Sequence, residues 1–443
     1  MKKDNLLIIF LVAMFGIYAW LRFENSQYIH EPRATFGDAH EYFDVSSFSI
    51  TSSSFWIAVR PPTIPLLFKI IGTDASSISK FQLGFSMLAW GILALTFIKT
   101  IRSYLVKPVA FSLILAFSLS QDVIMWDYLI ISESVSISIM ILFFSAAILL
   151  LEKWTWARLL LFGIIGIFFV FTRDAFAYLL LMVAVCLFLL VFFSTNKRKL
   201  ILVGVYLFFL YFCSNALASA SMRWYPSLLN TVAMRILPNP EYVEYFQARG
   251  MPIDDALMER SGKHAHADDN ALGKDPRFQD FLEWTRENGR KEYIRFLWFY
   301  KADALQNIFG DIQLLISPDL YYYSATGFRP VIRDMRFGEV LYPSRFGLFI
   351  LLVANLVASA SFVWALYERR DNWLLPILLI LLAYPQSVFI WNADTNEIGR
   401  HSIYHNIQWR LGLWLLILYA IDFVIEKKIF VEKLFAREKK NSL

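Results

Sequence analysis

The sequence predicts an all-α polytopic membrane protein with about ten transmembrane helices. Of its 443 residues, 57% are hydrophobic and 17% aromatic, whereas only 18% are charged. Soluble domains carry about a quarter charged residues, so the excess apolar surface is expected to face lipid. The charges also lie in short clusters between long apolar runs, which is the distribution that a bilayer imposes. The net charge of +5 is spread over these clusters and does not indicate nucleic-acid binding.

Ten apolar runs are long enough, or nearly so, to cross roughly 30 Å of hydrocarbon, which takes about 20 helical residues. They lie near residues 5–22, 81–101, 108–121, 133–151, 157–172, 175–195, 199–218, 346–367, 373–391 and 408–425. The first run lacks a small-x-small cleavage site and is interpreted as an uncleaved span. The shorter run at 61–72 begins with two prolines, which favour a helix start, and is expected to form an interfacial helix.

The basic residues between these runs predict the orientation of the chain. With the N-terminus in the cytoplasm, all the short basic loops fall on the cytoplasmic side, as the positive-inside rule requires. These loops lie at residues 2–3, 102–107, 153–158, 197–199 and 369–370, together with the tail. The inside loops are too short to build an active site. We therefore expect a multi-pass protein of the cytoplasmic (inner) membrane whose active site faces the periplasm or the cell exterior.

Four regions follow from this topology. The N-terminal transmembrane region covers residues 1–218 and includes a catalytic first external loop at 23–80. A mostly helical extracytoplasmic insertion is expected at 219–345, because this stretch is amphipathic and rich in interfacial aromatic residues. Three spans form a C-terminal transmembrane region at 346–425, and a basic cytoplasmic tail follows at 426–443.

The first external loop contains an acid and an arginine of the types that act in catalysis and in phosphate binding. Asp38 follows Gly37 directly and is followed by Glu41 and Tyr42. A carboxylate here can act as a general base towards a hydroxyl group, although a solvated loop acid explains the same residue. Arg60, just before the interfacial helix, can hold a phosphate through a bidentate contact or can simply extend to the membrane interface.

Two later pairs of residues can also be interpreted either as part of a site or as purely structural. Asp127 precedes the span that Glu133 opens, where an acid in the first turn also suits the helix dipole. Arg173 and Asp174 lie at the tip of the tight hairpin between two spans, where they can form a local ion pair.

The last external loop combines Glu397, Arg400 and His401, and His405 follows. In a helix, Glu397, His401 and His405 would share one face at four-residue spacing, as metal ligands or a proton relay can. Gly399 is expected to interrupt the helix, so no metal site is predicted. Arg400 is the better candidate for binding an anion.

Together these fragments resemble the GT-C superfamily of membrane glycosyltransferases, which use polyprenyl-phosphate-linked sugars. The resemblance covers roughly residues 1–220 and 346–425, and it depends on the order of the fragments and their common external side. It implies that Asp38 is the catalytic base of an inverting transfer from a polyprenyl-phosphate sugar to an acceptor hydroxyl. It assigns the donor phosphate to Arg60, Arg173, Arg400 and His401, with Glu41, Tyr42, Asp127, Glu133, Asp174 and Glu397 in support.

The partners expected from this resemblance are the lipid-linked donor, membrane lipid, and a glycan, lipid or protein acceptor. No cofactor is assigned, although a divalent cation beside the phosphate is compatible with the carboxylates. An external active site favours a lipid-linked donor on separate grounds, because sugar nucleotides are cytoplasmic.

Three other functions compete with this one. An O-antigen-ligase or polymerase type of enzyme would use a polyprenyl-diphosphate glycan, and the long 219–345 segment is compatible with it. A transporter or flippase would place ionisable residues near the middle of its spans, where this sequence has almost none. In a structural membrane protein, the external polar clusters would be incidental.

Overall fold

The computed structural model describes residues 3–29, 37–194, 196–265, 267–332, 335–368 and 370–441. Every regular element in these ranges is helical, which confirms the predicted all-α membrane class. Seven helices are long and apolar enough to cross a membrane, or eight if one bent pair counts as a span. Residues 30–36 of the first external loop, and residues 1–2, 369 and 442–443 of the basic segments, lie outside the described residues.

The N-terminal bundle is built around one deeply buried helix. Its members are α1 (Lys3–Ser26), α5 (Ala75–Thr100), α6 (Val106–Ser118), α8 (Glu133–Glu152), α9 (Trp156–Val170), α10 (Asp174–Leu190) and α11 (Lys197–Ala220). Helix α8 is the most buried of the candidate spans, with α5 and α9 packed beside it. The predicted spans at 157–172 and 175–195 correspond to α9 and α10, which have 15 and 17 residues and are shorter than the other spans.

The predicted span at 108–121 ends in a bend. Helix α6 is followed by α7 (Gln121–Ile124) and the 3-10 turn η1 (Met125–Tyr128), which together deviate from the α6 axis by 62°. The bend leads the chain back to the N-terminus of α8, and it places Asp127 next to α1.

The described part of the loop after α1, which is predicted to be external, folds into three short helices, α2 (Gly37–Ser47), α3 (Ser53–Trp56) and α4 (Thr63–Ile71). Helix α4 is the short helix predicted after the proline pair, and it packs on α2. Lys69 in α4 donates to the backbone oxygens of Ser46 and Phe48 at 2.9 and 2.8 Å, which satisfies carbonyls at the end of α2. These contacts hold α4 against the C-terminal end of α2.

The 219–345 segment is helical as expected, but it divides into two packing units. Its helices are α12 (Trp224–Thr231), η2 (Val232–Ile236), α13 (Pro240–Gln247), α14 (Asp255–Met258), α15 (Ala267–Lys274), η3 (Pro276–Phe278), α16 (Gln279–Trp284), η4 (Thr285–Gly289), α17 (Arg290–Phe299), α18 (Lys301–Gly310), α19 (Ile312–Ile316), η5 (Tyr321–Tyr323) and α20 (Met335–Leu341). Residues from Leu228 to Phe296 form a separate hydrophobic core. From Ile308 onwards the apolar side chains join the core of the transmembrane bundle instead.

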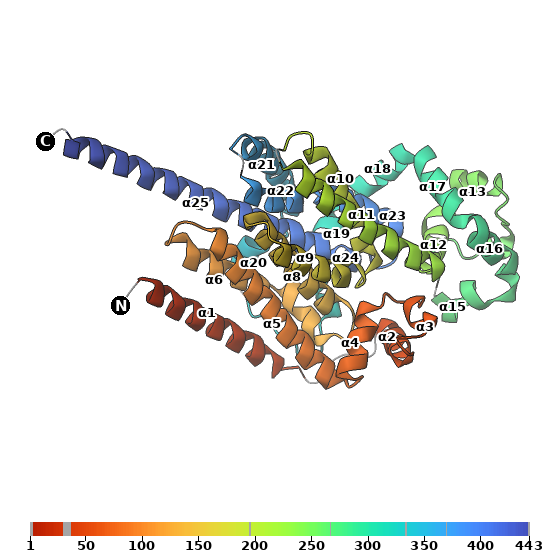
Figure 1. Cartoon of the computed structure of the whole chain (residues 1–443). Helices are drawn as coiled ribbons and strands as arrows, with labels where there is room; N and C mark the ends of the chain where they lie inside the picture. The colour runs from red at the N-terminus through yellow and green to blue at the C-terminus, as the bar shows by residue number, and fades with distance from the viewer. Residues whose placement is uncertain are drawn as a thin grey trace.

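The C-terminal region consists of α21 (Gly347–Glu368), η6 (Asp371–Trp373), α22 (Leu374–Leu381), α23 (Ala383–Ala393), α24 (Ile398–His401) and α25 (Ile403–Asn441). Helix α25 starts five residues before the predicted span at 408–425, so His405 lies inside a buried helix and not in the external loop. Both chain termini lie at one end of the molecule, and the helices α12 to α17 lie at the other (Figure 1).

The basic loops meet at the end of the bundle where the termini lie. Glu426 in α25 pairs with Arg102 at 2.5 Å and with Arg370 at 3.9 Å. Arg158 pairs with Glu152, the last residue of α8, at 2.9 Å. Loops that are far apart in the sequence therefore share one face, as the predicted topology requires.

Candidate functional site

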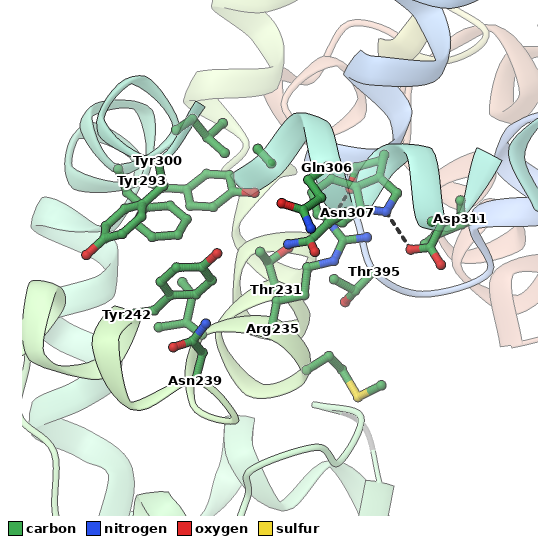
Figure 2. A pocket seen from close by; sticks show the side chains of 18 residues that line it. Thr231, Arg235, Asn239, Tyr242, Tyr293, Tyr300, Gln306, Asn307, Asp311 and Thr395 are labelled. Atoms are coloured by element: carbon green, nitrogen blue, oxygen red, sulfur yellow. Dashed lines mark hydrogen bonds between the residues drawn. The ribbon is translucent and has the colours of Figure 1, made fainter. Parts of the chain in front are cut away.

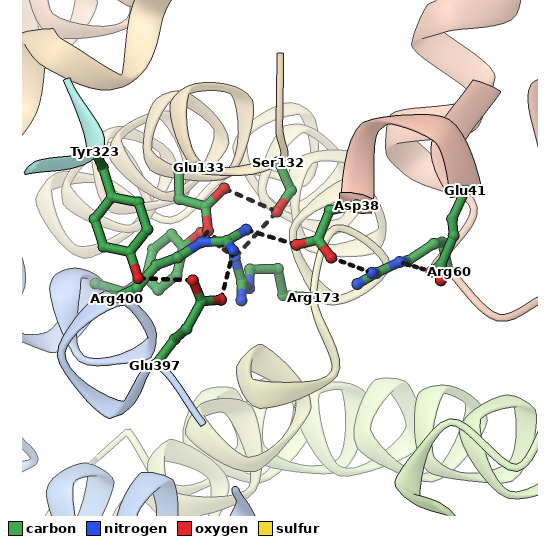
Figure 3. A network of polar contacts seen from close by, with 10 residues as sticks. Asp38, Glu41, Arg60, Ser132, Glu133, Arg173, Tyr323, Glu397 and Arg400 are labelled. Carbon is green, nitrogen blue, oxygen red and sulfur yellow. Dashed lines mark hydrogen bonds and ion pairs between the residues drawn. The ribbon is translucent and has the colours of Figure 1, made fainter. Parts of the chain in front are cut away.

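Arg400 is the centre of a charged cluster that joins four segments of the chain (Figure 3). Its Nε lies 2.7 Å from Glu133 Oε1, its Nη1 2.8 Å from Glu397 Oε2, and its Nη2 2.7 Å from Asp38 Oδ2. The side chain is only 4% exposed, so three carboxylates offset the loss of its hydration. The first external loop, the start of α8 and the last external loop are thereby held together.

Asp38 lies between two arginines at the N-terminus of α2. Its Oδ2 faces Arg400, and its Oδ1 lies 2.5 Å from Arg60 Nη2. Arg60 also donates from Nε to Glu41 Oε2 at 2.6 Å, and its guanidinium lies 5.2 Å from the ring centre of the buried Tyr42. Asp38 and Arg60 are 29% and 26% exposed, so this edge of the cluster is open to solvent.

Arg173 completes the cluster from the hairpin between α9 and α10. Its Nη1 donates to Glu133 Oε1 at 2.7 Å, to Ser132 Oγ at 3.0 Å and to the Tyr404 hydroxyl at 2.8 Å. The guanidinium lies 5.0 Å from the Tyr404 ring centre. Because Glu133 also accepts from Arg400, the acid that opens α8 is fully buried between two cations.

The loop between α23 and α25, which is predicted to be external, departs from its predicted geometry. Glu397 adopts a left-handed conformation with φ of 50°, which is uncommon for a residue other than glycine and common at functional sites. Its carboxylate accepts from Arg400 and, at 2.7 Å, from the Tyr323 hydroxyl. Gly399 lies within α24 and does not interrupt it, contrary to expectation. A Cβ there would come 2.8 Å from Pro318, so close packing requires the glycine.

Glu397, His401 and His405 do not share one helix, because the chain is interrupted after His401 and not at Gly399 as expected. Helix α24 ends at His401, and His405 lies in α25 with its Nε2 3.0 Å from the Leu315 oxygen and 3.1 Å from Ser387 Oγ. Among the described residues, no three His, Cys, Asp or Glu side chains come together as metal ligands would.

The electrostatics of the cluster favour charged carboxylates and a neutral histidine. Burial would raise the pKa of Asp38, but Arg60 and Arg400 hold that pKa well below its usual value. Burial and the neighbouring Arg173 and Arg400 lower the pKa of His401 to about 3. At neutral pH, His401 is therefore uncharged and can contact a phosphate through a hydrogen bond but not as a cation.

The structure does not bring two of the predicted supporting acids into the cluster. Asp174 forms a two-point ion pair with Arg223 at 2.8 and 3.0 Å, and Arg223 also donates to the Ala58 oxygen. The contact with Ala58 holds the loop segment just before Arg60 in place. Asp127 pairs with Arg22 in α1 and accepts from Ser134 Oγ at 2.6 Å.

Several donors in the cluster are available to a ligand. Within the described residues, neither Nη1 of Arg60 nor Nε and Nη2 of Arg173 makes a hydrogen bond. All three donor nitrogens of Arg400 are engaged with carboxylates. An anion can therefore be held by Arg60 and Arg173 on either side of Asp38, while Arg400 positions the carboxylates.

Sequence reasoning missed three residues of the site. Tyr404 follows Arg400 by four residues, but a predicted loop gave no reason to place both on one side. Tyr323 and Arg223 come from the 219–345 segment, for which no site residue was predicted. Only the spatial contacts of Tyr323 with Glu397 and of Arg223 with Asp174 identify them.

The cluster and the basic loops lie at opposite ends of α8. Glu133 is the first residue of this helix and belongs to the cluster, whereas Glu152 is the last and pairs with Arg158. Twenty helical residues at 1.5 Å each span about 30 Å, the thickness of the hydrocarbon core.

Comparison of the chain with protein-family models, curated protein sequences and solved structures finds no match.

Proposed function

We propose that this protein is an inverting glycosyltransferase of the GT-C type. It moves a monosaccharide from a polyprenyl-phosphate carrier to an acceptor hydroxyl on the extracytoplasmic side of the inner membrane. It crosses that membrane about ten times when α9, α10 and the bent pair of α6 with α7 and η1 are counted as spans in addition to the seven long apolar helices. The observation that carries this proposal is the partly exposed Asp38 carboxylate between Arg60 and Arg400. Attack on a phosphate-linked anomeric carbon needs a base that takes the proton of the acceptor hydroxyl and cations that stabilise the leaving phosphate.

In the proposed reaction, Asp38 removes the proton of the acceptor hydroxyl as its oxygen attacks the anomeric carbon from the face opposite the phosphate. The bond between that carbon and the phosphate oxygen breaks, and polyprenyl phosphate leaves with one additional negative charge. Arg60 and Arg173 stabilise this charge through their available N–H groups. The donor phosphate also competes with Asp38 for Arg60, which frees the carboxylate to act as a base.

The charge of the cluster favours a monophosphate over a diphosphate donor. Three arginines face four carboxylates, from Asp38, Glu41, Glu133 and Glu397, so the cluster has no excess of positive charge. A donor with one negative charge meets less repulsion there than a polyprenyl-diphosphate glycan with two.

The proposal is tested by incubating the purified full chain with a panel of polyprenyl-phosphate monosaccharides and an acceptor-containing membrane extract. We expect release of polyprenyl phosphate and a product of inverted anomeric configuration. Polyprenyl-diphosphate oligosaccharides tested in parallel should not react. Release from the diphosphate donors alone would replace this proposal with the ligase type of enzyme.

The orientation is tested separately with cysteine labelling in a background where Cys186 and Cys213 are serine. His40→Cys is exposed near Asp38, and Lys153→Cys is exposed on the face of the basic loops. A membrane-impermeant maleimide should label position 40 in intact cells and position 153 only after permeabilisation. The opposite pattern would place the cluster in the cytoplasm.

A further inference from the structure

A cavity of about 660 Å³ lies between the 219–345 segment and the loop that contains Thr395 and Ile398 (Figure 2). Pockets that bind small molecules measure roughly 300–1,000 Å³. Its floor is formed by the buried Thr231, Tyr242, Phe296 and Trp391, and exposed residues, among them Asn307, form its rim. The cavity does not include Asp38 or any arginine of the cluster around Arg400.

Aromatic rings form one side of the cavity and are held rigidly. Tyr242 packs edge-on against Phe296 and Tyr300, with ring centres 4.8 and 4.9 Å apart. The Tyr293 hydroxyl donates to the Asn392 oxygen at 2.9 Å. Figure 2 shows Tyr242, Tyr293 and Tyr300 together on this side. Fixed rings offer flat apolar faces and hydroxyl groups without a large loss of side-chain entropy on binding.

Polar side chains face these rings from the opposite side. Arg235 stacks on Trp391, with its guanidinium 3.4 Å from the ring centre, and Trp391 Nε1 donates to Asp311 Oδ2 at 2.8 Å. Gln306 and Asn307 add amide groups (Figure 2). One cation and one anion together with amides make a surface suited to a neutral ligand with many hydroxyl groups.

Two further observations indicate that the cavity binds something. Thr395 lines it, and the buried Thr395 Oγ1 has no hydrogen-bond partner among the described residues. A buried hydroxyl without a partner in the protein calls for one from elsewhere. In addition, Arg235 lies in η2, a single π-helical turn, and such turns occur frequently at functional sites.

The cavity and the charged cluster share one wall. Thr395 and Ile398 face the cavity, whereas Glu397 between them contacts Arg400 in the cluster. A ligand in the cavity therefore lies one loop away from Asp38.

We propose that this cavity binds a neutral carbohydrate, which is the glycan part of the acceptor. The C–H faces of the sugar rings pack on the tyrosines, and the hydroxyl groups bond to Arg235, Asn307, Asp311 and Thr395. The role as acceptor rests on the proposed glycosyltransferase function. The binding of a carbohydrate does not.

The test is saturation-transfer NMR on the detergent-solubilised full chain with maltotriose, mannotriose and xylotriose, without any donor. We expect transfer to the ring protons of at least one trisaccharide. Asn307→Ala, an exposed position, should weaken the signal at least fivefold, and Tyr300→Ala should abolish it. Tyr322→Ala, an exposed tyrosine outside the cavity, should leave it unchanged.

Absence of transfer to all three trisaccharides, or transfer that both cavity variants retain, would overturn the inference. If no donor releases polyprenyl phosphate but the trisaccharide signal is present and depends on Asn307, the carbohydrate site stands and the glycosyltransferase proposal fails. The two proposals therefore fail in different measurements.

Discussion

Two aspartate–arginine pairs lie near the N-terminus of α8. They consist of the same residue types but differ strongly in their exposure to solvent. Asp38 and Arg60 are 29% and 26% exposed, whereas Arg22 and Asp127 are 0% and 1% exposed. Consecutive residues of α8 serve the two pairs, because Glu133 contacts Arg400 beside Asp38 and Ser134 donates to Asp127.

The sealed pair, Arg22 and Asp127, is buried and holds helices together. Arg22 donates to the Tyr18 hydroxyl at 3.1 Å, to the Ser118 oxygen at 3.2 Å and to Ser86 Oγ at 2.8 Å, in addition to Asp127. These contacts join α1, α5 and the bend after α6. The pair leaves no room for a substrate, whereas the open pair has available N–H groups and access from solvent. Exposure to solvent, not residue type, distinguishes a chemical site from a structural one here.

The largest expected effect on stability comes from breaking the sealed pair. Arg22→Met leaves Asp127 buried without its partner, and we expect the free energy of unfolding to fall by about 3–5 kcal/mol. Thermal unfolding in detergent measures this. Arg22→Met combined with Asp127→Leu should recover much of the loss, because no charge is then left unpaired. Arg60→Met should cost about 1 kcal/mol or less, as partly exposed pairs do. Equal losses at both arginines would remove the distinction between the pairs.

Arg173→Ala should lower the rate of polyprenyl phosphate release about 10²–10³-fold, because it removes donors aimed at the developing charge. The melting temperature should change little in comparison with Arg22→Met. Arg277→Ala is the matched control and should retain full activity, because Arg277 is exposed and pairs with Asp275 in the 219–345 segment, away from the cluster. Unchanged release in Arg173→Ala would exclude it from the phosphate site.

The pH dependence of the reaction should report the arginines around Asp38. Because they hold the pKa of Asp38 low, kcat/KM should show no acid limb between about pH 7 and pH 5. Arg60→Ala removes one of the cations that oppose the effect of burial on Asp38. The pKa of Asp38 should therefore rise, and the acid limb of kcat/KM should move to higher pH. In the wild type, the limb of kcat should lie above that of kcat/KM, since bound phosphate competes for Arg60. An acid limb that Arg60→Ala leaves in place would contradict this electrostatic coupling.

The same shift predicts the direction of acid destabilisation. A carboxylate with a lowered pKa in the folded state stabilises the protein above its ordinary pKa of about 3.9. That contribution is lost as the pH falls through the lower value of the folded state.

Glu41→Gln should have the smallest effect. Glu41 is half exposed, and within the described residues its ion pair is with Arg60, which Asp38 continues to hold. We expect a loss of turnover below about fivefold, in line with the small contribution of an exposed ion pair. A loss as large as that of Arg173→Ala would show that Glu41 takes part in the reaction itself.

The sequence predicted much of this comparison but not its central feature. Apolar run length locates the helices, and Asp38, Arg60, Glu133, Arg173, Glu397 and Arg400 were each candidates that the structure brings together. Asp127 was assigned to the same set because linear order cannot show that the bend after α6 turns it towards Arg22. The cavity beside Arg235 could not be predicted, because its residues come from distant helices without a common motif.

The most direct test measures polyprenyl phosphate release by Asp38→Asn and Asp127→Asn side by side, with each rate divided by the amount of folded protein. Both substitutions remove one charge and keep the shape of the side chain. We predict that Asp38→Asn melts below the wild type but above Asp127→Asn, because its pairs with Arg60 and Arg400 are partly exposed, and that it loses about 10²–10⁴-fold in rate per folded molecule. Asp127→Asn should melt at lower temperature and retain nearly full activity per folded molecule. Activity that survives in folded Asp38→Asn would contradict its role as the catalytic base.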